Sequence, residues 1–386
     1  MARRFGIGLV GAGYLGKAFA LGYRSAPVIF GPEIGAPDLV TGAASTPERG
    51  PAEAAALGFR RAAADWRAVV DDPEVDIVVV NTPNALHAPV ALAAIAAGKA
   101  VHCEKPLGLT GAEALAMMRA AEAARVPTMV GFNYRQNPAC TLAREIIAGG
   151  ELGEVYSVRG THCEDWAADP TVPLGWKTRR ATAGYGALGD VGSHITSILE
   201  YLLGPIARVN GTVRTVHPRR PVAAGASAMV DIETDDEARF LVEFASGVAG
   251  SVEASRVAVG RQMALTYEVT GTRGALYFTQ ERLSELQLYQ WDGHSRARAG
   301  FRTLLIGPEH PDYGWFNQGP GHGLGFNDQK IIECARFMQA IGGGTRPSPD
   351  FRDAAHVNLV LDAVLKSAAG GGWVTVPAIG QPGSGT

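Results

Sequence analysis

Short apolar runs rich in β-branched residues alternate with alanine-rich segments over the first third of the chain. The runs that we predict to be strands are Phe5–Val10, Leu39–Ala43, Asp76–Val80, Ala100–Cys103 and Thr128–Phe132. The segments between them carry helix signals, of which the clearest is a capping box from Thr110 to Glu113. This alternation predicts a parallel, doubly wound sheet with right-handed crossovers.

Beyond Phe132 the pattern changes to a helix at 138–148, followed by extended segments in which apolar and polar residues alternate. The predicted strands are residues 154–162, 207–216, 228–232, 239–243, 248–256, 265–270, 275–279 and 285–291. Because glycine-containing turns join them, we expect one large, mostly antiparallel open sheet. Helices at 327–341 and 353–367 and a strand at 373–376 complete this part.

The change of pattern predicts two domains, and a chain of 386 residues is long enough to bury two cores. We expect an α/β domain over 1–132, an α+β domain over 133–378 and a loose tail over 379–386. Hydrophobic residues make up 46% of the chain and charged residues 19%, which excludes disorder for its bulk.

Charge and cysteine usage narrow the range of partners. Lys+Arg 35 against Asp+Glu 38 gives a net charge of -3 with no long run of one sign, which argues against a nucleic-acid or membrane partner. The 4 cysteines form no C-x-x-C pair, and no apolar run reaches the length of a membrane helix. A small neutral molecule, a cytoplasmic location and no metal are therefore expected.

A glycine-rich loop follows the first predicted strand directly, and a helical pattern follows the loop. Its residues are Gly11, Ala12, Gly13, Tyr14, Leu15 and Gly16, which form a G-x-G-x-x-G motif. The first glycine permits a tight turn, the second lets the backbone approach a pyrophosphate, and the third allows close packing of helix on strand. The setting predicts a Rossmann domain that binds a dinucleotide, and a glycine-rich turn without a ligand is the alternative.

The end of the second strand bears on the choice between NAD and NADP. Asp38 has the usual spacing from the glycines for a ribose-binding acid, but it precedes the strand and so lies at the wrong end. The strand leads instead to Ser45, Thr46 and Arg49, which suit a 2′-phosphate. The alternative is that the hydroxyls cap the next helix and that Arg49 is solvated. We expect a slight preference for NADP.

Two further loops fall at the carboxyl ends of parallel strands, where doubly wound folds bind ligands. One holds Asn81, Thr82, Pro83 and Asn84, with His87 just beyond, and the other is Glu104-Lys105-Pro106. The chain has only six lysines, so one that follows a buried strand at once stands out. Such a lysine can donate to a substrate oxygen. An exposed structural lysine is the alternative interpretation.

A third motif, Gly189-Asp190-Val191-Gly192-Ser193-His194, begins a predicted helix. Asp190 and His194 are four residues apart and should share a helix face. A histidine that titrates near neutrality can take a hydroxyl proton, and a neighbouring carboxylate favours its charged form. Taken alone, this helix is better explained by an acid near a helix start followed by a solvated histidine.

Taken together, these motifs resemble those of the Gfo/Idh/MocA oxidoreductases, and the resemblance covers nearly the whole chain. It implies a nicotinamide on the first domain, and a homodimer or homotetramer built through the open sheet of the second. It also implies that Lys105 contacts the substrate, that Asp190 is its polar companion and that His194 is the acid/base. The motif departs at Ala44, where many members carry an acid, and this leaves NAD and NADP both open.

The middle of the chain resembles the sugar and cyclitol dehydrogenases of this family. The matching stretches are residues 132–135, 164–166, 174–176, 186–190 and 252–256. Aromatic faces can cover the C–H face of a polyhydroxylated ring, and polar forks can bond its hydroxyls. The candidate substrate residues are Tyr134, Arg135, Glu164, Asp165, Trp166, Trp176, Asp190 and His194. Core packing is the alternative for Tyr134 and the two tryptophans.

The sequence therefore predicts an NAD(P)-dependent dehydrogenase that moves a hydride between a ring secondary alcohol and the nicotinamide. The ring belongs to a sugar, an anhydrosugar or an inositol. Two alternatives share the fold: an NAD-dependent glycosidase that works by transient oxidation and elimination, and a non-catalytic nucleotide-sensing regulator. The regulator ranks last because it has no use for Lys105, Asp190 and His194.

Overall fold

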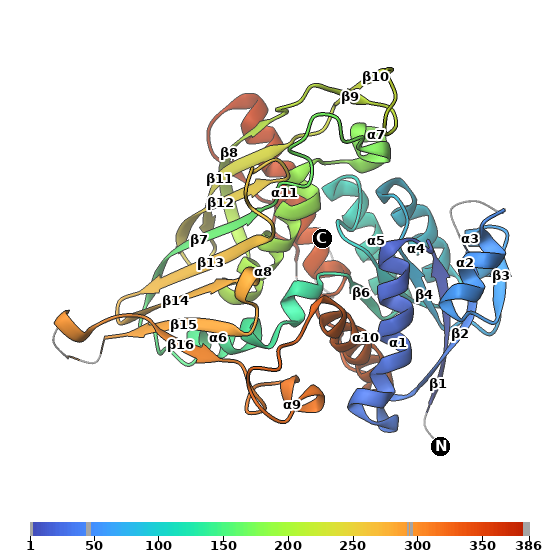
Figure 1. Cartoon of the computed structure of the whole chain (residues 1–386), viewed down its shortest axis with the longest axis horizontal. Helices are drawn as coiled ribbons and strands as arrows, with labels where there is room; N and C mark the ends of the chain where they lie inside the picture. The colour runs from blue at the N-terminus through green and yellow to red at the C-terminus, as the bar shows by residue number, and fades with distance from the viewer. Residues whose placement is uncertain (1–2, 44–47, 292, 294–295, 381–386) are drawn as a thin grey trace. The chain divides into compact units, whose positions relative to one another are not determined.

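The computed structural model of the chain describes residues 3–43, 48–291, 293 and 296–380. It divides into two compact units (Figure 1). The first consists of Met1–Gln136, Gly325–Ala355 and Ile379–Thr386, and the second of Asn137–Leu324 and His356–Ala378. The first unit thus takes in a late segment, 325–355, that the expected boundaries of 1–132 and 133–378 assign to the second domain. Most of the expected tail, 381–386, lies outside the described residues.

The first unit is built on a six-stranded sheet with the order β3-β2-β1-β4-β5-β6, in which all pairs are parallel. Its strands are β1 Arg4–Val10, β2 Ala36–Ala43, β3 Arg61–Ala63, β4 Ile77–Val80, β5 Ala100–Cys103 and β6 Thr128–Val130. Its complete helices are α1 Tyr14–Phe30, α2 Gly50–Leu57, α3 Trp66–Val70, α4 His87–Ala96, α5 Gly111–Ala124 and α10 Phe326–Gly343, and α11 Phe351–Gly370 begins in this unit. The predicted doubly wound sheet is confirmed, with the short edge strand β3 in addition.

Local chemistry accounts for the ends of several of these elements. The Thr110 hydroxyl accepts the Glu113 N–H at 3.2 Å and so caps α5, while the Glu113 carboxylate accepts the N–H of Leu109. The helix α10 packs along α1 at Gly22, where an added Cβ would lie 2.8 Å from the Cys334 sulfur. This close approach explains why 325–355 belongs to the first unit.

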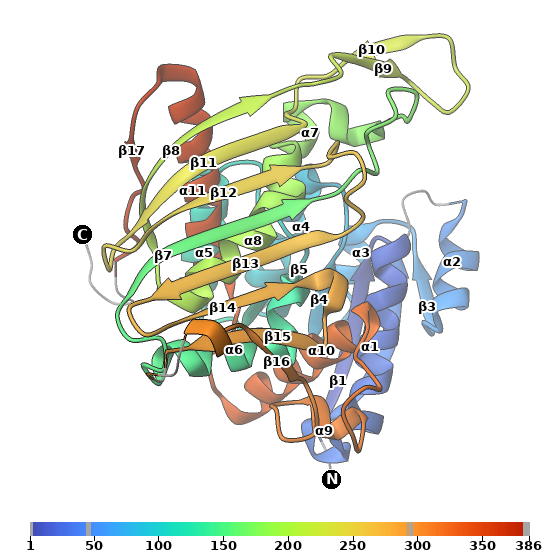
Figure 2. The same ribbon diagram turned by 60° about the vertical axis from the view of Figure 1, so that its left-hand side comes forward.

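The second unit is built on a nine-stranded sheet with the order β16-β15-β14-β13-β7-β12-β11-β8-β17 (Figure 2). Only β7 and β12, at its centre, run parallel. The strands are β7 Val155–Cys163, β8 Ile206–Arg214, β11 Glu237–Phe244, β12 Ala249–Ser255, β13 Ala264–Gly271, β14 Gly274–Thr279, β15 Glu285–Gln290, β16 Arg302–Leu305 and β17 Val374–Thr375. A separate hairpin pairs β9 Arg219–Pro221 with β10 Met229–Asp231. The large, mostly antiparallel sheet is therefore as predicted, except that the predicted strand 228–232 lies in the separate hairpin, as β10.

Helices cover one face of this sheet, and the other face is open. The helices of the unit are α6 Pro138–Ala148, α7 Arg180–Ala183, α8 Ser193–Leu203, α9 Tyr313–Phe316 and most of α11. At Gly160 of β7 an added Cβ would lie 2.8 Å from Ile195, so α8 packs directly on the sheet. On the open face Arg159 and Arg239 are exposed and Leu241 is 49% exposed.

Over the described ranges, every helix is too short or too polar to cross a bilayer.

Candidate active site

The glycine-rich loop joins β1 to α1 as the sequence predicts. Gly11 has a φ of +102°, and an added Cβ there would lie 2.1 Å from the backbone oxygen of Asn81. An added Cβ at Gly16 would lie 2.6 Å from the Gly11 oxygen, so helix and turn meet closely. At Gly13, the residue before α1, no atom lies within 4 Å of an added Cβ. The loop therefore fits a pyrophosphate, with a bare backbone and open space at a helix N-terminus.

The end of β2 carries no described acid. Asp38 lies near the start of β2, where its carboxylate pairs with Arg4 and Arg60. Ser45 and Thr46 lie outside the described residues. Arg49 is described, and its Nη2 lies 2.5 Å from Glu53 Oε1, one turn along the next helix.

The loop after β4 is tied to the loop after β5 by a buried histidine. His87 Nδ1 lies 3.0 Å from the Pro106 oxygen, and its Nε2 lies 3.1 Å from the Thr82 oxygen. Burial lowers the pKa of His87, although the facing carbonyls act in the opposite direction. A neutral ring has one N–H and can donate to only one of these oxygens at a time. Asn81 adds a bond from Nδ2 to the Gly11 oxygen at 3.0 Å, which joins the glycine loop to the same edge.

Lys105 follows β5 and the buried Glu104. The carboxylate of Glu104 accepts the Lys105 N–H at 3.2 Å through Oε2, and Oε1 lies 2.7 Å from the ammonium of Lys330 on α10. Sequence reasoning missed Lys330. The Lys105 side chain itself is half-buried. The backbone of the predicted substrate-contacting lysine is thus fixed by a buried ion pair.

In the second unit, a buried carboxylate shapes the segment that carries Asp190 and His194. Asp235 accepts the N–H groups of Gly186 and Leu188 at 2.8 and 2.7 Å. Burial raises the pKa of Asp235, against the effect of these hydrogen bonds. The residues Leu188–Gly192 form a π-helical turn, and the α-helix begins only at Ser193. The four-residue spacing of Asp190 and His194 therefore spans two helix types rather than one α-helical turn.

Asp190 has an ion-pair partner that the sequence analysis did not select. Lys177 Nζ lies 2.5 Å from Asp190 Oδ2. The same nitrogen lies 4.8 Å from the ring centroid of Trp166 and 5.8 Å from that of Trp176. Both indoles are more than a third exposed, at 37% and 38%, which argues against the core-packing alternative for them. The cluster presents aromatic faces, an ammonium and a carboxylate together.

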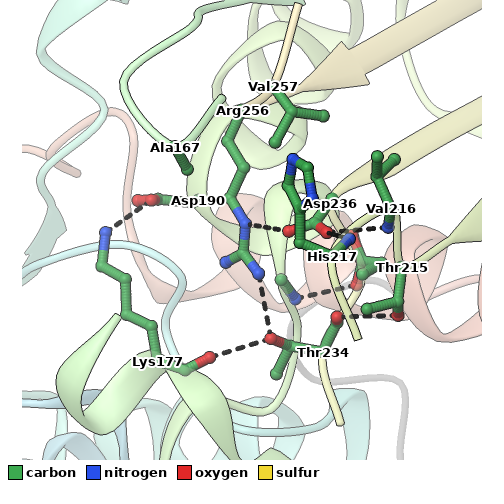
Figure 3. A network of polar contacts seen from close by, with 12 residues as sticks. Ala167, Lys177, Asp190, Thr215, Val216, His217, Thr234, Asp236, Arg256 and Val257 are labelled. Carbon is green, nitrogen blue, oxygen red and sulfur yellow. Dashed lines mark hydrogen bonds and ion pairs between the residues drawn. The ribbon is translucent and has the colours of Figure 1, made fainter. Parts of the chain in front are cut away.

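A buried network of hydrogen bonds holds the backbone carbonyl of Lys177 (Figure 3). The Thr234 hydroxyl donates to the Lys177 oxygen at 2.8 Å, and Arg256 Nη2 donates to that hydroxyl at 3.2 Å. Arg256 also pairs with Asp236 at 2.9 Å, and both side chains are fully buried. An ammonium on such a rigid support is held in place before any ligand binds.

His194 is buried at the start of α8, close to a second histidine. The rings of His194 and His162 have centroids 5.7 Å apart. His162 faces two acceptors, the Val191 oxygen and Glu164 Oε1, each at 3.0 Å. Through the Val191 oxygen, His162 anchors the turn between Asp190 and His194, and the carboxylate of Glu164 is the second hydrogen-bond partner of the His162 ring.

The other predicted substrate residues have partners of their own. Arg135 is buried, with Nη2 3.0 Å from the Ser348 hydroxyl and Nη1 3.6 Å from Asp353. Asp165 accepts the Gly260 N–H at 3.1 Å. Tyr134 is half-buried, and its ring centroid lies 6.3 Å from that of Phe326.

One signal in the sequence could have identified Lys177. The scarcity of lysine singled out Lys105, and it applies equally to Lys177, which follows Trp176 directly. Lysine and tryptophan side by side supply both a cation and a π face for a ligand.

The site residues support proton transfer and the binding of a polyhydroxylated ring. Indole faces pack on C–H groups, while an ammonium and a carboxylate bond hydroxyls. A histidine can receive a proton near neutral pH. Redox chemistry needs a dinucleotide, which the glycine loop fits.

Comparison with known proteins extends this result. Residues 5–132 match the family described as "Oxidoreductase family, NAD-binding Rossmann fold", and residues 141–277 match the "GFO/IDH/MocA C-terminal domain". The chain is 40% identical to levoglucosan dehydrogenase of Pseudarthrobacter phenanthrenivorans over 97% of this chain and 98% of that protein.

Solved structures agree with the sequence comparison. A levoglucosan dehydrogenase in complex with NADH and levoglucosan matches with a TM-score of 0.93 and 41% identity, covering 97% of this chain and 100% of that one. An inositol dehydrogenase homologue from Azotobacter vinelandii, in complex with NADH and myo-inositol, matches with a TM-score of 0.80 and 26% identity, covering 97% and 98%. The chain therefore belongs to the Gfo/Idh/MocA family of NAD-binding oxidoreductases.

Proposed function

We propose that this chain is an NAD(P)-dependent dehydrogenase that oxidises a ring secondary alcohol of a sugar, an anhydrosugar or an inositol. The observation that carries the proposal is the cluster of Trp166, Lys177, Trp176 and Asp190, which joins two exposed indole faces to an ion pair. This combination suits a ring with one C–H face and several hydroxyls. The 40% identity to levoglucosan dehydrogenase supports an anhydrosugar as the first candidate.

We assign a separate role to each catalytic residue. A dinucleotide held at the glycine loop would supply the hydride acceptor for this oxidation. His194 receives the hydroxyl proton as general base. Lys105 donates a hydrogen bond to the same oxygen and stabilises its developing negative charge. Asp190, held by Lys177, orients the hydroxyl that reacts.

For the cofactor, we propose a slight preference for NADP over NAD. The support is the charge at the two ends of β2, because Asp38 is committed to Arg4 and Arg60 near the strand's start. Arg49 follows the strand's other end, and its exposed side chain can exchange its half-buried partner Glu53 for a phosphate. The glycine loop, Asn81, His87 and the Glu104–Lys105 segment are the other proposed cofactor contacts.

We also propose that the chain forms a homodimer or homotetramer through the nine-stranded sheet, and that it works in the cytoplasm. The open face of that sheet carries exposed Leu241 beside Arg159 and Arg239, and a second copy could cover it. The four cysteines are buried and none is in a disulfide, which suits a reducing compartment. Light scattering of the purified protein tests the assembly, and a monomer at micromolar concentration would exclude it.

A spectrophotometric screen tests the proposed reaction. Levoglucosan, other anhydrosugars, simple sugars and inositols are offered with NAD and with NADP, and the absorbance of the reduced nicotinamide is followed. Accumulation with one or more polyols, and none in a Lys105→Ala variant, is the expected result. Release of a product from a glycoside without reduced nicotinamide would favour the elimination mechanism instead.

A further inference from the structure

A lysine side chain lies fully buried inside the first unit, on α10. Lys330 Nζ lies 2.7 Å from Glu104 Oε1 and 2.8 Å from Glu333 Oε1, and 4.1 Å from the centroid of the Phe19 ring. Lys330 and Glu333 are 0% exposed, and Glu104 is 4% exposed. A buried charge is costly unless it is paired, so this arrangement is strongly constrained.

The carboxylate of Glu104 is held from more than one side. Besides its contact with Lys330, it accepts the Lys105 N–H at 3.2 Å. Behind it, an added Cβ at Gly131, just past β6, would lie 2.5 Å from Glu104 Oε1, so a larger residue there would displace this carboxylate. Lys330 thus reaches the backbone of Lys105 through a single intervening side chain.

The other titratable groups that surround this cluster are neutral. His102, on β5, bonds to Glu333 through Nε2 and to the Tyr23 hydroxyl of α1 through Nδ1, and burial lowers its pKa. Burial raises the pKa of Tyr23 and of the thiols of Cys103 and Cys334. Among the described residues of the cluster, Lys330 therefore supplies the ammonium that faces the carboxylates of Glu104 and Glu333.

Two carboxylates outnumber the one ammonium. Burial by itself would lower the pKa of Lys330, but Glu104 and Glu333 raise it above its ordinary value. Burial alone would raise the pKa of Glu333, and Lys330 reverses this and lowers it. Without the ammonium, the two buried carboxylates would lose the partner that they share, which is costly for buried polar groups.

We propose that Lys330 is a positioning residue for Lys105. Its ammonium holds the Glu104 carboxylate in place, and that carboxylate fixes the backbone of Lys105. This inference rests on the proposed function in so far as Lys105 acts on the substrate, but the order of the loop can be measured without any substrate.

The test compares Lys330→Met with Glu333→Gln. Both variants disturb the same buried cluster, but only the first removes the partner of Glu104. Hydrogen exchange, read by mass spectrometry over 104–109, should speed up by about ten-fold or more in Lys330→Met and stay near wild type in Glu333→Gln, because a lost hydrogen bond exposes its amide to exchange. With an active substrate, kcat should fall by about 10- to 100-fold only in Lys330→Met, which is the scale of a small misplacement of a catalytic group.

Other outcomes have distinct meanings. If the rise in exchange and the fall in kcat are in proportion to the drop in melting temperature, and to the same degree in both variants, then Lys330 is only a stabilising residue and the proposal is wrong. If Lys330→Met does not fold, Glu104→Gln interrupts the same chain of contacts and should give the same faster exchange, and normal exchange there also overturns the proposal. A wild-type protein without activity on any polyol would contradict the proposed function and leave the exchange result valid.

Discussion

The ammonium of Lys177 lies 2.5 Å from the carboxylate of Asp190 and beside the faces of two indoles. The side chains of this pair are 28% and 22% exposed, so they are neither sealed in the core nor free in solvent. Part-buried charges of this kind are accessible to a ligand and are less screened than surface charges. The pair is where we expect the hydroxyls of the substrate to bind.

Replacement of Lys177 by methionine should weaken catalysis strongly. The change keeps the length of the side chain but removes the charge, so Asp190 loses its partner and one hydroxyl loses a donor. We expect kcat/KM to fall by about 10- to 100-fold, which corresponds to the loss of a charge-assisted hydrogen bond. Steady-state kinetics with the best polyol measure this. Lys366→Met, at an exposed lysine of the same unit, is the matched control and should behave as wild type.

Removal of either indole beside Lys177 should affect the binding of the polyol and not of the cofactor. Trp166→Ala and Trp176→Ala should each raise KM about 5- to 10-fold, because a stacked ring contributes on the order of 1 kcal/mol. Trp373→Ala removes an exposed indole stacked on Arg208 and provides the control. An unchanged KM together with a lower melting temperature would identify the pair as packing residues.

The parts of this site that the sequence predicted are those fixed by neighbouring residues. The roles of Gly11 and Gly16 can be predicted from the strand and the helix on either side of them. The place of Lys105 at the edge of the sheet can be predicted because it comes just after a buried strand. The contact between Lys177 and Asp190 joins residues 13 positions apart, across short helices, loop and a π-turn, which no single helical or strand period describes. Lys330 lies 226 residues from Glu104, and on an amphipathic helix nothing local marks it as buried. The strands β3, β9 and β16 were missed because three or four residues carry too little pattern.

Loss of the proposed general base should be visible in the pH profile as well as in the rate. Oxidation needs a neutral His194, so kcat in that direction should rise with pH through an ionisation of the imidazole. His194→Ala should lose about 10²- to 10⁴-fold in kcat and lose the low-pH limb. Lys105→Ala should lose at least as much, because it removes a charge placed against the alkoxide. Near-normal kcat in the His194 variant would show that His194 is not the general base and would assign that role to Lys105.

The preference for NADP can be tested at Arg49. If this guanidinium binds the 2′-phosphate, Arg49→Ala should weaken NADP by about ten-fold, the scale of a lost charged hydrogen bond, and leave NAD unaffected. Fluorescence titration with both cofactors measures the change, and Arg67→Ala, at an exposed arginine of the same unit, is the control. A wild-type protein that binds NAD more tightly would overturn the preference.

The buried imidazole of His87 should make the fold sensitive to acid. Because burial lowers its pKa in the folded protein, the unfolded chain binds a proton that the folded chain excludes. Stability is therefore highest above the ordinary imidazole pKa of about 6.5 and falls as the pH drops from there toward the folded value. His102 has a lowered pKa as well and acts in the same direction.

Melting temperatures between pH 7.5 and 5, in steps of about half a unit, test this expectation. His87→Asn removes the titrating group and keeps a side-chain donor, so its melting temperature should be lower at neutral pH and depend less on pH. A slope equal to that of wild type would show that His87 does not contribute to the acid sensitivity.

The late position of α10 has a consequence for how the protein is made. When the ribosome has released residues 1–136, every strand of the first sheet exists, but His102 and Glu104 lack Glu333 and Lys330. Residues 137–324 must be translated before those partners emerge. The Rossmann sheet therefore keeps a carboxylate without its buried partner until α10 has been synthesised. A truncated product that ends after 136 should consequently be a substrate for chaperones and proteases rather than a stable nucleotide-binding domain.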